Sequence, residues 1–180
     1  MLFRSARYYV SVSYVDEGGM YKVDEGLKDY NTNANYRRWN YRLNVDMDIT
    51  KSTLLKVGVA GSLDKKNEPG MAGNIWASAM RNNPISVPVM YSNGYVPAYG
   101  SENDQLNPWV AATQTGYQET WNNKLQANAT LEQSLNFITK GLKFIGRYGF
   151  DTNNYQWINR KKFPEMWRAE QNRASDGSLV

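Results

Sequence analysis

The sequence predicts an all-β fold, an antiparallel meander of about five long strands, and three observations support this prediction. Apolar and polar residues alternate in five separate segments, which is the period of a β-strand. Long and short polar connections alternate between these segments. The mean hydropathy is -0.68, and no run approaches the ~18 apolar residues of a membrane-spanning helix.

The segment 38–49 shows the alternation most clearly. Its even positions are charged or amide side chains, and its odd positions are apolar. Strands of soluble proteins usually contain ~5 to 6 residues, whereas a tilted strand that crosses a bilayer needs ~9 to 11. We therefore expect the odd face of this strand to contact lipid and the even face to line a wet lumen. The residues expected to face lipid are Trp39, Tyr41, Leu43, Val45, Met47 and Ile49.

The other strands are predicted from the same alternation. The first covers 7–15, with Tyr8, Val10, Val12 and Tyr14 on one face. A short turn near 50–53 leads from the segment 38–49 into a strand at 54–64. A fourth strand at 120–137 and a fifth at 142–157 are joined by a turn near 138–141.

The longest connection, between 65 and 119, contains two smaller elements. Met71, Ile75 and Ala79 share one face at helical spacing, and Asn83-Pro84 ends the pattern, which predicts a short helix at 71–81. Asn93-Gly94 lies between two apolar stretches, which predicts a small β-hairpin.

The order of the connections is long, short, long, short. Membrane barrels of the bacterial outer membrane have long extracellular loops and short periplasmic turns. Their aromatic residues gather at the membrane boundaries, and this chain contains 13 Tyr and 6 Trp. These features favour a segment of a transmembrane β-barrel, with the helix and the hairpin in a long extracellular loop. A soluble β-sandwich is the alternative.

Composition excludes several kinds of chemistry. The chain has no Cys and no His, so it lacks thiolates, disulfides and imidazole groups. Asp46 and Asp48 lie two residues apart, but a polar lumen face explains them, and no third metal ligand is identifiable. The net charge of +4 is spread along the chain, which does not indicate nucleic-acid binding. We expect no enzymatic activity, no cofactor and no metal.

Several segments, in their order, resemble a known family, the SusC/RagA-type TonB-dependent outer-membrane transporters. The likeness covers nearly the whole chain. It is carried by Tyr8-Tyr9-Val10-Ser11-Val12-Ser13-Tyr14, Arg42-Leu43-Asn44-Val45-Asp46-Met47-Asp48-Ile49-Thr50, Leu55-Lys56-Val57-Gly58-Val59, Arg81-Asn82-Asn83-Pro84, Pro88-Val89, Asn93-Gly94, Asn107-Pro108, and the strand from Gly141-Leu142 to Gly149-Phe150-Asp151.

The resemblance implies a location in the bacterial outer membrane and energised import of oligosaccharides or peptides. It implies a SusD-like surface lipoprotein and the TonB complex as partners of the full-length transporter. Barrels of this kind have 22 strands, of which about five are predicted here. The sequence has no counterpart of the signal peptide or the plug domain. We therefore expect residues 1–180 to be a partial barrel domain, a fragment of such a transporter.

The long connection also carries candidate ligand-binding residues among Asn and Gln side chains. Aromatic faces with neighbouring amides can stack on sugar rings or peptides and donate hydrogen bonds to them. Packing of these rings against the barrel rim is the alternative explanation. A secreted β-sandwich that binds carbohydrate is the alternative function. The candidate residues are Trp76, Tyr91, Tyr95, Tyr99 and Trp109.

Overall fold

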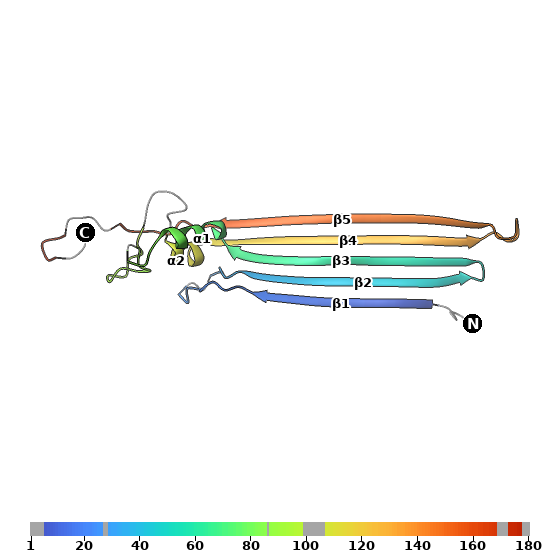
Figure 1. Ribbon diagram of the computed structural model, residues 1–180, viewed down its shortest axis with the longest axis horizontal. Helices are drawn as coiled ribbons and strands as arrows, with labels where there is room; N and C mark the ends of the chain where they lie inside the picture. Colours follow the sequence, from blue (N-terminus) through green and yellow to red (C-terminus); the bar gives the residue numbers. More distant parts are fainter. Residues whose placement is uncertain (1–5, 27–28, 86, 99–106, 169–172, 178–180) are drawn as a thin grey trace. The chain divides into compact units, whose positions relative to one another are not determined.

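In the residues that the structure describes, the chain forms a five-stranded antiparallel meander and two short helices. The computed structural model describes residues 6–26, 29–85, 87–98, 107–168 and 173–177. The strand order follows the sequence, as Figure 1 shows. This architecture confirms the predicted all-β fold class. The strands are β1 (Ala6–Gly18), β2 (Asn35–Thr50), β3 (Thr53–Pro69), β4 (Gly116–Ser134) and β5 (Lys143–Lys161).

The five predicted strands are all present, with different ends. Most run further than the alternation indicated, and β3 and β4 contain 17 and 19 residues. The fourth strand was predicted to reach residue 137 but ends at Ser134. Leu135 instead closes the following turn, because its amide donates to the carbonyl of Leu142 at 2.9 Å and its carbonyl accepts from Ile138 at 2.9 Å.

Two short connections join strands at the same end of the sheet, as Figure 1 shows. Lys51 and Ser52 connect β2 to β3, and the Thr50 hydroxyl donates to the hydroxyl of Thr53 at 2.7 Å. Residues 135–142 connect β4 to β5 and include Gly141 at a φ of 88°. The other two connections, 19–34 and 70–115, are long. The predicted alternation of long and short connections is therefore confirmed.

The chain divides into two compact units. The sheet unit comprises Met1–Glu17, Tyr36–Lys65 and Thr120–Gln156. The loop unit comprises Gly18–Asn35, Lys66–Glu119 and Trp157–Val180.

In the sheet unit, polar and apolar side chains separate onto two faces as the alternation predicts. The rings of Trp39 on β2 and Tyr14 on β1 lie 4.4 Å apart between centroids. On the opposite face, the neighbouring Asn40 donates from Nδ2 to the Ser13 hydroxyl at 3.1 Å. Adjacent residues of β2 thus contact adjacent residues of β1 on opposite faces. The register between the strands is thereby fixed.

Two helices pack together in the loop unit. The helix α1 (Ala72–Arg81) confirms the predicted helix. The helix α2 (Pro108–Thr113) was not predicted, although Asn107 caps its first turn and Pro108 occupies its first position. Buried Ile75 of α1 forms a small apolar core with Ala111 and Ala112 of α2. Among the described residues, no helix is long and apolar enough to span a membrane.

The predicted hairpin is reduced to its turn. Gly94 adopts a φ of 86°, and the Tyr91 amide donates to the carbonyl of Tyr95 at 2.8 Å. The flanking residues do not continue as a pair of strands. Pro97 instead forms an isolated parallel bridge with Trp167, because Val96 and Ala98 exchange backbone hydrogen bonds with that residue.

Candidate functional site

In the sheet unit, apolar side chains are exposed and a central polar side chain is buried, which is the reverse of a soluble protein. Tyr8 and Val12 of β1 are 79% and 64% exposed, whereas Ser62 in the centre of β3 is only 5% exposed. Within the described part of the chain, every buried apolar side chain belongs to the loop unit. The sheet therefore has no apolar core of its own in the described residues, and its apolar face is open.

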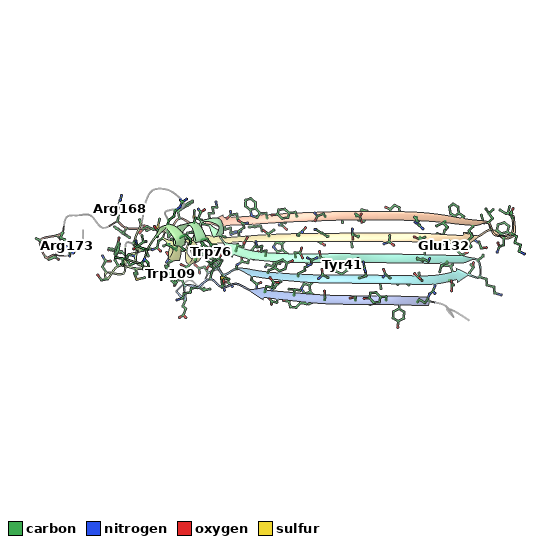
Figure 2. All side chains as sticks on the ribbon, in the orientation of Figure 1. Tyr41, Trp76, Trp109, Glu132, Arg168 and Arg173 are labelled. Carbon is green, nitrogen blue, oxygen red and sulfur yellow. The ribbon has the colours of Figure 1, made fainter. Side chains whose placement is uncertain are left out.

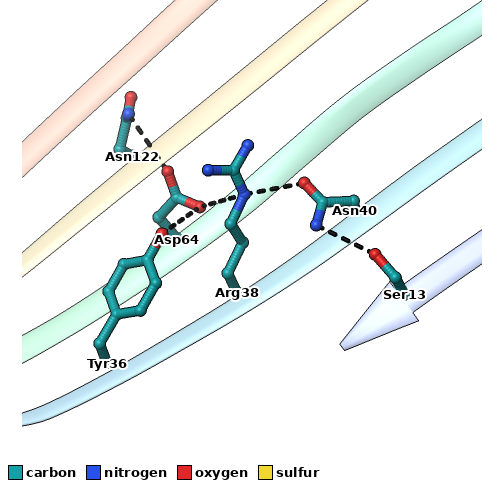
Figure 3. Close-up of polar contacts among 6 residues, drawn as sticks. All are labelled: Ser13, Tyr36, Arg38, Asn40, Asp64 and Asn122. Carbon is teal, nitrogen blue, oxygen red and sulfur yellow. Dashed lines mark hydrogen bonds and ion pairs between the residues drawn. The ribbon is translucent and has the colours of Figure 1, made fainter. Parts of the chain in front are cut away.

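On the polar face, hydrogen bonds and ion pairs connect four adjacent strands, as Figure 3 shows. Asp64 of β3 accepts from Asn122 of β4 at 3.5 Å and lies 3.4 Å from Nε of Arg38 on β2. The same Nε donates to Oδ1 of Asn40 at 2.8 Å, and Asn40 contacts β1 through Ser13. These contacts place charged and amide side chains in a continuous row across the sheet.

An open hollow of about 790 Å³ lies beside this row. Residues of all five strands line it, and nearly all of them are polar. They include Tyr9, Ser11 and Ser13 of β1, Arg38, Asn40 and Arg42 of β2, Ala60 and Ser62 of β3, Lys124 and Gln126 of β4, and Asp151 and Asn153 of β5.

The hollow shows that the polar face is concave. The edge strands β1 and β5 are separated by four strand spacings of ~4.8 Å, and side chains on a flat sheet project in parallel. A curl of the sheet toward the polar face accounts for a hollow that both edge strands line. The apolar side chains consequently project from the convex face.

Small side chains on β3 explain why this space is empty. Ala60, Gly61 and Ser62 form its floor, whereas longer side chains surround them on the adjacent strands. On the other face, the Tyr41 ring occupies the space where Gly61 lacks a side chain. Tyr41 lies on β2, as labelled in Figure 2.

Asp46, one of the two acidic residues considered for metal binding, has a structural explanation. Asp46 lies 3.6 Å from the guanidinium of Arg7 on the neighbouring strand. Across the ranges that the structure describes, no group of three possible metal ligands occurs.

The structure places the predicted loop aromatics in separate elements. Trp76 of α1 is 60% exposed, and Trp109 of α2 is partly buried (Figure 2). Tyr91 and Tyr95 lie in one tight turn, and Tyr99 lies outside the described residues. In the described segments, no ring contact joins Trp76 or Trp109 to Tyr95.

Two features of these sites were not found from the sequence. Trp167 stacks on Tyr95, with ring centroids 4.6 Å apart and an interplanar angle of 18°. These residues are 72 positions apart, and no local pattern indicated their contact. The alternation predicted a polar face, but the grouping of Arg42, Lys124 and Asp151 around one hollow depends on the register of β2, β4 and β5.

No protein-family model matches the chain, and no curated protein matches it either.

Proposed function

We propose that the chain forms part of the wall of a transmembrane β-barrel that imports oligosaccharides or peptides across a bacterial outer membrane. The observation that supports this best is a long-stranded sheet with an exposed, convex apolar face and a concave polar face. In a membrane barrel the convex face contacts lipid and the concave face lines the lumen. A soluble barrel requires the opposite arrangement, because its apolar side chains fill the interior.

The free energy of the apolar face supports a nonaqueous environment for it. Removing one large apolar side chain from water contributes ~1.5 to 3 kcal/mol. Exposed side chains of this kind occur on both edge strands, including Tyr8 and Val10 on β1 and Phe144 and Tyr148 on β5. Lipid covers such a face without a second protein layer. The strands also exceed the ~9 to 11 residues needed for crossing.

The transport function and the partners rest on the resemblance to SusC/RagA-type transporters. In that proposal, five strands form one sector of the barrel, and a SusD-like lipoprotein and the TonB complex act on the complete transporter. The two short connections at one end of the sheet are consistent with periplasmic turns.

Ligand contact by the loop aromatics is a separate part of the proposal. Of the predicted set, Tyr95 is the residue whose ring stacks on another exposed ring. Tyr95 and Trp167 are each 48% exposed. A stacked pair with accessible ring surface is suited to contact the face of a sugar ring.

The proposal is tested by placing a charge on each face of β2. Leu43→Arg puts a cation on the convex face, where a position near the bilayer midplane costs about 2 to 4 kcal/mol. Asn44→Arg is the matched control, because it adds the same charge to the adjacent residue on the other face. In flotation with phospholipid vesicles, we expect wild-type chain and Asn44→Arg to float and Leu43→Arg to remain largely unbound.

The proposal would be contradicted if the wild-type chain were folded and monomeric in buffer without detergent and did not bind to vesicles. That outcome would favour the secreted β-sandwich. Equal flotation of Leu43→Arg and Asn44→Arg would contradict the assignment of the two faces.

A further inference from the structure

We propose that the hollow on the polar face binds a saccharide bearing a carboxylate, such as a uronic acid. This inference names a ligand class for the proposed transporter. It rests on the proposed function, because it places the hollow on the path of the imported solute. Its evidence is the volume, charge and hydrogen-bonding groups of the hollow itself.

The size of the hollow suits a small ligand. Its volume of about 790 Å³ lies within the ~300 to 1,000 Å³ typical of small-molecule sites. The small side chains of Ala60 and Ser62 leave the central floor free of long side chains. Because the hollow is open to solvent, recognition must come from polar groups and from charge, rather than from enclosure.

The charges around the hollow favour an anion. Elsewhere on the polar face, carboxylates already pair with cations, as Asp46 does with Arg7 and as Glu132 does with Lys56 at 2.6 Å. Among the cations of the hollow, Arg38 is similarly paired with Asp64 at 3.4 Å.

Arg42 and Lys124 differ from Arg38, since neither has an ion-pair partner within the described ranges. They project from β2 and β4, which flank the small residues of β3. The strands β2 and β4 are two strand spacings apart, which amounts to ~10 Å. Both side chains are long enough to reach one carboxylate between these strands. Arginine offers two parallel donors to a carboxylate, and lysine adds a compact positive charge.

The remaining groups favour a monoanionic polyol over a phosphate. Asp151 also lines the hollow and carries a negative charge that opposes a multiply charged anion. The same carboxylate can accept hydrogen bonds from hydroxyl groups. Ser11, Gln126 and Asn153 add further donors and acceptors around the floor. One carboxylate surrounded by hydroxyls matches this set.

The test compares galacturonate, which carries one carboxylate, with its neutral methyl ester, which has the same ring and hydroxyls. Binding to the full 180-residue chain in detergent micelles is measured by calorimetry. We expect the acid to bind at least about tenfold more tightly than the ester, and Arg42→Gln or Lys124→Gln to weaken binding of the acid by about tenfold. Asp151→Asn should strengthen it. Added salt should weaken binding of the acid and leave the ester unaffected.

Lys140→Gln is the matched control, because it removes the same charge from the turn between β4 and β5, outside the residues that line the hollow. Circular dichroism must show that each variant keeps its strand content. Equal affinity for acid and ester would overturn the inference, as would equal losses in Lys140→Gln and Arg42→Gln.

The two proposals fail in different ways. If the chain floats with vesicles but does not bind galacturonate, the barrel proposal stands and the acidic-sugar site is wrong. If the chain binds the acid through Arg42 and Lys124 but does not bind lipid, the acidic-sugar site stands and the barrel proposal is wrong.

Discussion

At Gly61 of β3, the neighbouring strands β2 and β4 leave no room for a side chain. A Cβ at this position would collide with the hydroxyl end of Tyr41 on β2 and with the carbonyl oxygen of Lys124 on β4. The Tyr41 ring can move, but the backbone carbonyl of an adjacent strand cannot move without disturbing the ladder. Glycine is therefore required by packing at this position.

We expect Gly61→Ala to destabilise the folded sheet by about 1 to 3 kcal/mol, the usual range for overpacking. Gly58→Ala is the control, because its Cβ would first meet the side-chain amide of Asn128 at 2.9 Å, which can rotate away. Urea unfolding in detergent micelles measures both variants. Equal stability of Gly61→Ala and wild type would show that β2, β3 and β4 do not have this register.

At the scale of one element, α2 depends on a single buried amide. Asn107 accepts from the Trp109 amide at 3.0 Å, which caps the helix. Its Nδ2 donates to the carbonyls of Pro88 and Pro97 at 3.3 and 3.4 Å. One side chain thus connects the start of α2 to two points of the loop that precedes it.

Removing this side chain should loosen α2 locally. Loss of a helix cap costs about 0.5 to 2 kcal/mol, and Asn107→Ala also leaves two carbonyls without their donor. We expect amide hydrogen exchange across 109–114 to accelerate by about tenfold in Asn107→Ala and less in Asn107→Ser, which retains an acceptor for the cap. Unchanged exchange in Asn107→Ala would show that packing of α1 on α2 suffices.

At the scale of the whole sheet, the two faces differ in what they require from their surroundings. The polar face satisfies part of its charge internally through pairs such as Arg38 with Asp64. The apolar face has no protein cover in the described residues. The outer edges of β1 and β5 are unpaired in the part that the structure describes (Figure 1), which agrees with the expectation that five strands form only part of a closed wall.

Because the sequence contains no cysteine, the two faces can be distinguished by labelling single introduced thiols. We expect Ser13→Cys on the polar face to react with a water-soluble maleimide in vesicles, and Val12→Cys on the apolar face to be protected. Denaturation in urea should equalise the two rates. Equal reactivity in vesicles would mean that lipid does not cover the apolar face.

The strands could be predicted from the sequence because each face has a uniform chemical requirement. The alternation in 38–49 depends only on the two-residue period of a strand, so it identified β2 and assigned Trp39 and Asn40 to opposite faces. The helix at 71–81 was found for the same reason, since its apolar positions repeat at helical spacing. The short helix α2 was missed because six residues give too little periodicity, although its Asn-Pro start was visible.

By itself, the sequence determined the all-β meander, the two chemically different faces and the alternation of long and short connections, because these follow from local periodicity and turn residues. Only the tertiary structure decided that the polar face is concave, that Arg42 and Lys124 flank one hollow, and that Trp167 stacks on Tyr95. Those features depend on strand register and on contacts between distant residues. A pattern read along one segment contains neither.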